Sequence, residues 1–146
     1  MKMASMPIAV LMQRRALKHR WANEAWSAVG VVPNRGNLPP LHVLSESAER
    51  DYYLVSGLDL ELYSDDNESY FENAVAPESK VFVLWRMEGG RAIPVRASVS
   101  YSEGTRMFDN GENADGVVMP AEIHAWLSDY LREHYKPRPR RGREHG

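Results

Sequence analysis

Five histidines are the first candidates for catalysis or metal binding in this 146-residue chain. They are scattered, and the two that share the last predicted helix, His124 and His134, are ten positions apart. At 3.6 residues per turn, their side chains point about 80° away from each other. Neither has a second histidine four positions away, the spacing that brings two imidazoles to one metal ion. The histidines therefore predict no metal site and no catalytic base.

Two acidic segments have carboxylates close enough in sequence to suggest a divalent-cation site. One spans residues 59–72 and the other spans residues 109–115. A calcium loop needs ligands at alternate positions, a glycine at the bend and a bidentate glutamate at its distal end. The first segment has no glycine, and the second has no glutamate at that end. We therefore interpret them as a solvated strand-and-turn face and as a turn that ends a helix.

Nucleophile and phosphate-binding motifs are also missing from the sequence. No serine stands in Gly-x-Ser-x-Gly, and no Gly-x-x-x-x-Gly-Lys is present. The chain has no cysteine, which excludes disulfides, thiolate-bound zinc, iron–sulfur ligation and thiol catalysis within it. We therefore predict no catalytic residue, no cofactor and no metal, and a protein that is not an enzyme. An enzyme with an unrecognised site would need a pocket of convergent polar groups with perturbed pKa values.

The formal net charge of −2 conceals a strong asymmetry along the chain. Residues 1–20 carry five basic and no acidic residues, and residues 136–146 carry five basic residues and one glutamate. Residues 21–135 therefore hold eight basic and 19 acidic residues, a net charge of −11. Phosphate contact needs a basic surface, so this acidic body argues against nucleic-acid binding by the body of the protein. The basic tail remains a candidate binding arm.

Hydrophobic periodicity predicts more strands than helices. Alternating or continuous apolar residues predict strands at 7–15, 25–32, 80–85, 91–99 and 115–118, and a hairpin of 51–55 with 58–63 around Ser56-Gly57. Ser100 and Glu103 match a capping box that starts a helix ending at Gly111. Apolar residues at helical spacing predict a second helix, near 120–135. We therefore expect an α+β fold, with a mainly antiparallel sheet of about five to six strands, a helix near 101–110 and a C-terminal amphipathic helix near 120–135.

The length of the chain fits one domain of ordinary size. We expect a disordered N-terminus at 1–6, a single globular domain at 7–135 and a disordered basic tail at 136–146, where Pro137 and Pro139 prevent further helix. No apolar run approaches the roughly 20 residues of a membrane span or the about 7–15 residues of a signal peptide core. These features predict a cytoplasmic protein.

Several ordered motifs together resemble a known family. In chain order they are Met12-Gln13-Arg14-Arg15, Trp21, Trp26, Val32-Pro33, Tyr53, Leu58-Asp59-Leu60-Glu61-Leu62, Glu68-x-Tyr70-x-x-Asn73, Val81-Phe82-Val83-Leu84-Trp85-Arg86, Pro94, the helix from Ser100, Asp109-Asn110-Gly111-Glu112, Val118-Met119-Pro120, Ala125-Trp126 and the basic tail. Across residues 6–141, the chain resembles a family of small proteobacterial proteins of unknown function, encoded beside genes for formate dehydrogenase and molybdoenzymes. The family has no catalytic residues to transfer.

The resemblance implies a non-enzymatic accessory protein. It would support assembly, maturation or membrane association of a formate dehydrogenase or related molybdoenzyme by binding a subunit or a maturation factor. The residues that we expect to contact this partner are Arg14, Arg15, Trp21 and Trp26, the hairpin acids Asp59 and Glu61, and the tail arginines Arg138, Arg140 and Arg141. Tryptophan and arginine are favoured in such contacts, whereas Trp85 and Trp126 lie on core-patterned elements and are expected to be buried.

An alternative hypothesis is a small adaptor that binds nucleic acid or anionic lipid through its basic tail. At roughly 1 kcal/mol for each basic residue near an anionic membrane, five tail charges would give weak, salt-sensitive adhesion.

Overall fold

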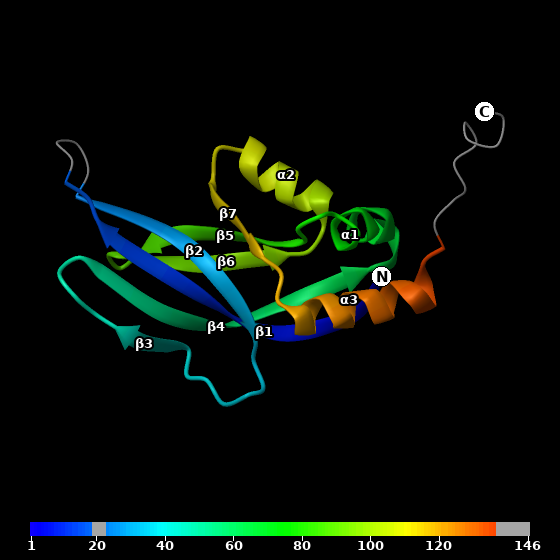
Figure 1. The fold of residues 1–146 in the computed structure, drawn as a ribbon, viewed down its shortest axis with the longest axis horizontal. Helices are drawn as coiled ribbons and strands as arrows, with labels where there is room; N and C mark the ends of the chain where they lie inside the picture. Colours follow the sequence, from blue (N-terminus) through cyan, green and yellow to red (C-terminus); the bar gives the residue numbers. More distant parts are fainter. Residues whose placement is uncertain (19–22, 137–146) are drawn as a thin grey trace.

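The computed structural model describes residues 1–18 and 23–136. Seven strands, one 3-10 turn and three α-helices are formed by this part of the chain (Figure 1). In order they are β1 (Lys2–Ala16), β2 (Glu24–Pro33), β3 (Leu41–Ser45), β4 (Arg50–Tyr63), η1 (Ser64–Asp66), α1 (Asn67–Ala74), β5 (Lys80–Glu88), β6 (Arg91–Ser98), α2 (Tyr101–Asp109), β7 (Asn113–Val118) and α3 (Ala121–His134). None of these helices is long and apolar enough to cross a membrane.

The strands form two antiparallel sheets, with orders β2-β1-β4-β3 and β6-β5-β7. The sheets meet along two borders, because β2 lies beside β7 and β4 lies beside β6. One core fills the space between them, and α1 and α3 close it at one end (Figure 1). The α+β class and the antiparallel pairing are therefore as predicted, and the strands divide between two sheets instead of forming one.

The central strand β1 supplies much of this core. Ile8, Val10 and Met12 alternate along it and are fully buried. On β5, Val81, Val83 and Trp85 face the same core, whereas Phe82 and Leu84 face the opposite way, toward Met107 of α2. The continuous apolar run of β5 therefore serves two different layers, which is why it shows no alternation.

The N-terminus differs from the prediction of a disordered segment at 1–6. Strand β1 begins at Lys2, and Lys2 to Met6 pair with the end of β4. The Lys2 ammonium also donates to Glu61 over 3.0 Å, and the backbone N–H of Ser64 donates to the carbonyl of Met1. Cross-strand pairing thus orders a segment that has no apolar period of its own. Of the predicted basic tail, residues 137–146 lie outside the described residues.

The predicted hairpin around Ser56-Gly57 is wrong. Residues 50–63 form one continuous strand, and the register against β1 shifts by one residue between Ile8 and Ala9. Gly57 is the extra residue of this β-bulge, with φ +105°, a conformation that glycine adopts without the penalty of a side chain. The glycine therefore bends a strand instead of reversing the chain.

Helix α2 begins where its capping signal predicts. The hydroxyl of Ser100 accepts from the backbone N–H of Glu103 over 3.2 Å, and Gly111, with φ +68°, follows the end of α2. Only half of the capping box forms, because the Glu103 carboxylate pairs with Arg96 while the hydroxyl of Ser98 accepts from the backbone N–H of Ser100.

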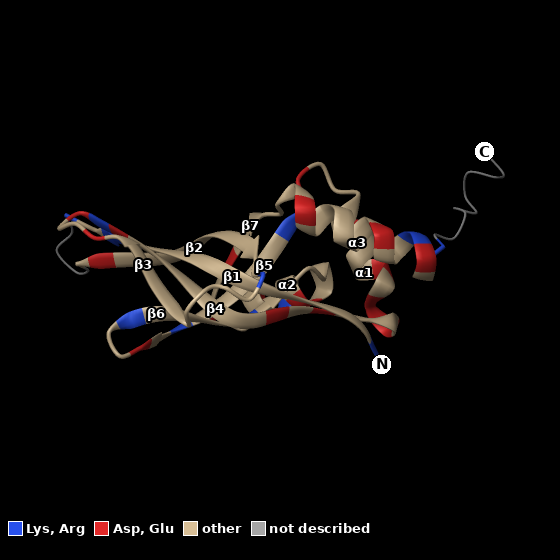
Figure 2. Ribbon diagram, turned by 90° about the horizontal axis from the view of Figure 1, so that it is seen from below, with Lys and Arg blue, Asp and Glu red and all other residues tan. Residues whose placement is uncertain are grey.

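A carboxylate joins the two sheets. One oxygen of Asp115, on β7, accepts from the backbone N–H of Ala28 on β2 over 2.9 Å and from the indole N–H of Trp85 over 2.8 Å. This contact satisfies the polar end of a buried tryptophan, as buried indoles require. Most other charged residues lie on the helices and near the strand ends, so the middle of each sheet is largely uncharged (Figure 2).

Candidate functional site

The structure divides the predicted partner-binding residues between the two ends of the molecule. Arg14 and Trp26 are direct cross-strand neighbours on β1 and β2, and Arg15 follows on the other face of the sheet. Asp59 and Glu61 lie far along β4, beside the N-terminal end of β1. The other expected contacts, Trp21 and the three tail arginines, lie outside the described residues.

Arg14 is engaged within the fold. Its Nε donates to Asp51 over 2.7 Å, and one of its terminal nitrogens donates to the carbonyl of Ser47 over 2.8 Å. Glu24 lies 3.6 Å away on β2, and the Arg14 side chain is only 12 % exposed. The guanidinium therefore fastens the turn between β3 and β4 to the sheet, a supporting role instead of a free contact.

This ion pair shifts both pKa values in the direction of the charged forms. Hydrogen bonding to Asp51 raises the pKa of Arg14, and hydrogen bonding from Arg14 lowers the pKa of Asp51. A carboxyl with a lowered folded pKa stabilises the fold above its unfolded pKa, and this contribution is lost as the pH falls through the folded pKa.

We therefore expect the Asp51→Asn variant to be less stable than the wild type at pH 7, with the difference shrinking below about pH 4. Urea unfolding from pH 7 to pH 3 measures this. Glu88→Gln, at an exposed carboxylate that makes no ion pair with a described residue, is the control and should match the wild type throughout. A constant difference for Asp51→Asn would contradict the prediction.

Trp26 is also part of the packing. Its ring meets Tyr53 edge-on at 6.4 Å between centroids, and the guanidinium of Arg91 lies 4.9 Å from the Tyr53 ring on the same core-facing side. The Tyr53 hydroxyl donates to the carbonyl of Ala92 over 2.5 Å, and burial raises its pKa to about 12. Trp26 therefore helps to close one end of the core. Trp85 is buried, and Trp126 is half-buried against the same core.

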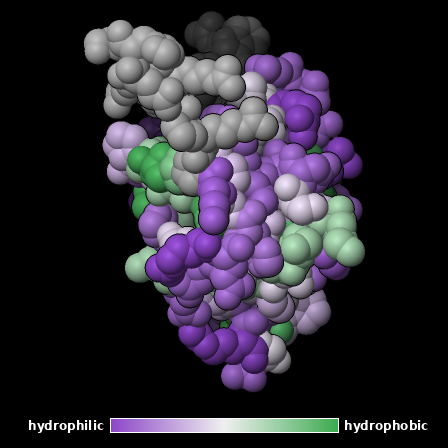
Figure 3. All heavy atoms as spheres, turned by 90° about the vertical axis from the view of Figure 1, so that its right-hand side faces the viewer, coloured by the Kyte–Doolittle hydropathy of each residue, from purple (hydrophilic) through white to green (hydrophobic). Residues whose placement is uncertain are grey.

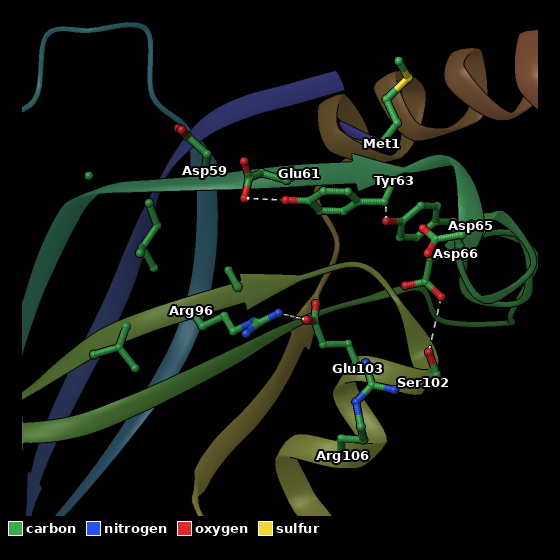
Figure 4. A pocket seen from close by; sticks show the side chains of 15 residues that line it. Met1, Asp59, Glu61, Tyr63, Asp65, Asp66, Arg96, Ser102, Glu103 and Arg106 are labelled. Atoms are coloured by element: carbon green, nitrogen blue, oxygen red, sulfur yellow. Dashed lines mark hydrogen bonds and ion pairs between the residues drawn. The ribbon is translucent and has the colours of Figure 1, made fainter. Parts of the chain in front are cut away.

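Asp59 and Glu61 line a polar cleft of about 820 Å³ between β4, β6 and α2 (Figure 4). Three charged groups of its lining are already paired, since Glu61 contacts Lys2 and Arg96 contacts Glu103. Burial raises the pKa of Tyr70, whose hydroxyl accepts from the backbone N–H of Tyr63. Asp59 and Arg106, which also line the cleft, make no ion pair with a described residue. No three acidic or histidine residues in the described ranges are grouped to hold a metal ion.

A smaller groove of about 320 Å³ lies between α1 and α3. Phe71, Val75 and Leu131 line it, and His124 bonds to the carbonyl of Ala74 over 2.9 Å at its side. The histidine is therefore tied to the backbone of the neighbouring helix. The face that carries this end of the molecule is mostly hydrophilic, with separate apolar spots (Figure 3).

The edge strand β3 is the most unusual surface, and the sequence pattern did not single it out. All five of its residues are exposed, including Leu41 at 37 %, Val43 at 38 % and Leu44 at 50 %. Among the described strands, it pairs with β4 alone, at the outside of the larger sheet (Figure 1). It carries no Lys, Arg, Asp or Glu, the residues with which sheet edges are commonly protected.

Along the outer edge of β3, the described part of the chain does not pair with the outward-pointing backbone groups. The N–H of Ser56 donates to the carbonyl of Pro40, and the register places Leu41 opposite Val55 and Val43 opposite Tyr53. Because bonded and non-bonded pairs alternate in an antiparallel ladder, Leu41 and Val43 direct their backbone N–H and C=O groups away from β4. These groups can accept a further strand.

A model of one protein family matches residues 7–144, almost the entire chain. The chain belongs to this family. It is described as "Protein of unknown function (DUF3305)", so the match confirms that the chain belongs to a family of unknown function and assigns no activity. No curated protein and no solved structure matches the chain.

Proposed function

We propose that this DUF3305 protein is a non-enzymatic accessory protein that binds a partner protein. A strand of the partner pairs with the outer edge of β3. The exposed, uncharged outer edge of β3 is the observation that carries the proposal. In strand addition, main-chain hydrogen bonds supply affinity and alternate side chains supply specificity. Leu41 and Val43 offer both, because their backbone groups point outward and their side chains are about one third exposed.

The proposed partner is a subunit or maturation factor of a formate dehydrogenase or related molybdoenzyme, encountered in the cytoplasm. The resemblance supports this choice, because the family that the motifs resemble is encoded beside genes for formate dehydrogenase and molybdoenzymes. Because the chain has no cysteine, it has no thiolates with which to carry an iron–sulfur cluster. Assistance would therefore come from holding a partner polypeptide during assembly, maturation or attachment to the membrane.

The test uses the full chain as bait in nuclease-treated extracts of a formate-grown bacterium that encodes it. Val43→Pro removes an outward N–H while leaving the bonds to β4 in place, because proline is tolerated at such edge positions. We expect it to reduce capture of formate dehydrogenase subunits or maturation factors about tenfold or more.

Val43→Thr is the matched control, because threonine keeps the N–H and the branched shape. It should capture the same proteins as the wild type. Equal capture by Val43→Pro and wild type would refute strand addition at β3. In a parallel capture without nuclease, recovery of nucleic-acid-linked proteins alone, lost after nuclease treatment and after deletion of residues 136–146, would support the tail adaptor instead.

A further inference from the structure

Two neighbouring cross-strand pairs of the β1–β4 ladder differ in charge: one joins opposite charges and the other joins like charges. The register places Arg14 opposite Asp51 and, one residue further, Arg15 opposite Arg50. Side chains alternate between the faces of a sheet, so the first pair lies on the core-facing side and the second on the outer side. Arg14 and Asp51 form an ion pair. The outer pair brings together two cations.

Nothing in the described part of the chain neutralises this outer pair. Arg15 and Arg50 are both exposed, and neither makes an ion pair with a described residue. The other cross-strand neighbour of Arg15 is Ala25 on β2. Like charges directly opposite each other destabilise a sheet. The pair therefore weakens the fold, and a bound anion would reduce the repulsion between the two guanidinium groups.

The surroundings of the pair suit a small acidic group. On the same face, the Gln13 amide donates to the Tyr52 hydroxyl over 3.0 Å, which leaves a neutral surface beside the two guanidinium groups. Of the nearby acids, Glu24 contacts Arg14, and Glu49 lies exposed in the turn next to Arg50. A guanidinium binds a carboxylate with two parallel hydrogen bonds, so two of them offer a specific site for acidic side chains.

We propose that Arg15 and Arg50 bind acidic side chains of the partner segment that adds to β3, an inference that rests on the proposed function. Arg50 begins β4 directly after the turn from β3, so the charge pair continues the proposed binding surface at the same end of the sheet. An acidic protein segment fits better than nucleic acid, because it can present a few carboxylates to the pair, whereas residues 21–135 carry a net charge of −11 and repel a long polyanion.

The experiment titrates the isotope-labelled full chain with a decaglutamate peptide at about 20 mM salt, followed by NMR. We expect the largest shifts at Arg15 and Arg50, and about tenfold weaker binding for Arg50→Glu. The same variant should melt about 1–3 °C higher than the wild type, because it replaces a repulsive pair with an attractive one. A variant that gains stability while it loses binding would show that the arginine pair serves ligand binding at the expense of folding stability.

Arg106→Glu is the matched control, because Arg106 is an exposed arginine of α2 that makes no ion pair with a described residue. It should bind decaglutamate within about twofold of the wild type. Shifts spread evenly over the arginines, or tighter binding of a ten-phosphate thymidine oligonucleotide to the pair, would overturn the proposal. If Val43→Pro loses the captured partner while Arg50→Glu retains it, strand addition stands and the arginine pair fails.

Discussion

Replacing Asn73 with leucine is expected to destabilise the folded protein by about 3–5 kcal/mol. Asn73 is fully buried near the end of α1, and its amide holds three segments together. The amide nitrogen donates to the carbonyls of Lys80 over 2.7 Å and Val99 over 2.8 Å, and the amide oxygen accepts from the backbone N–H of Lys80 over 2.9 Å. Leucine has a similar volume, but these three backbone groups lose their hydrogen bonds to the Asn73 amide. Urea denaturation measures the change.

Two further variants separate hydrogen bonding from packing at this position. Asn113→Leu changes an exposed asparagine of β7 and should alter stability by no more than about 0.5 kcal/mol. Asn73→Asp keeps one oxygen acceptor but points a second oxygen at two carbonyls. A carboxyl there is tolerated better when it is protonated, so this variant should recover stability relative to the wild type as the pH falls toward about 4. An Asn73→Leu variant as stable as Asn113→Leu would show that the three bonds contribute little.

Elements with a strong local signal could be predicted from the sequence. The apolar run at Val81–Trp85 and the helical stripe of Ile123, Leu127 and Tyr130 are found where the pattern places them. In both cases the residues themselves bury enough apolar surface to determine their structure. The segment at 41–50 gave no such signal, because an edge strand such as β3 buries neither face and needs no apolar alternation.

The errors come from information that lies in a distant strand. A glycine with positive φ serves a turn or a bulge equally well, so Gly57 could be assigned only by counting residues on β1. Lys2 to Met6 are ordered by pairing with β4, and pairing leaves no local trace. The acids at Asp59 and Glu61 therefore line a cleft on a continuous strand instead of a hairpin face.

The candidate site was partly predictable for the same reason. The sequence singled out the segment from Arg14 to Trp26, and the structure shows these two residues side by side. Which arginine forms the ion pair could not be predicted, because the neighbours Asp51 and Arg50 depend on the register of two strands more than 30 residues apart. Arg14 is engaged and Arg15 is exposed, although they are neighbours in the sequence.

Gly104→Ala is expected to destabilise the protein by about 1–3 kcal/mol, although the same change in a helix interior normally stabilises by about 1 kcal/mol. Gly104 is buried in α2, against the ring of Phe82 on β5. A methyl group added at Gly104 would lie 2.5 Å from one ring carbon and 2.7 Å from two others, well inside van der Waals contact. The Phe82 ring also contacts the rings of Tyr101 and Phe108, so moving it away from an added methyl group would disturb both contacts.

Replacing Phe82 with a smaller side chain tests whether this clash causes the predicted destabilisation by Gly104→Ala. In a Phe82→Leu background the ring is gone, so Gly104→Ala should become neutral or stabilising, a coupling of about 1–3 kcal/mol in the double-mutant cycle. Thr105→Ala, at the exposed next position of α2, is the control for helix propensity and should change stability by less than about 0.5 kcal/mol. If Gly104→Ala remained equally destabilising without the ring, close packing of α2 on β5 would not be the reason for glycine. Restored stability would show that the aromatic face of Phe82 is what requires a glycine at position 104 of α2.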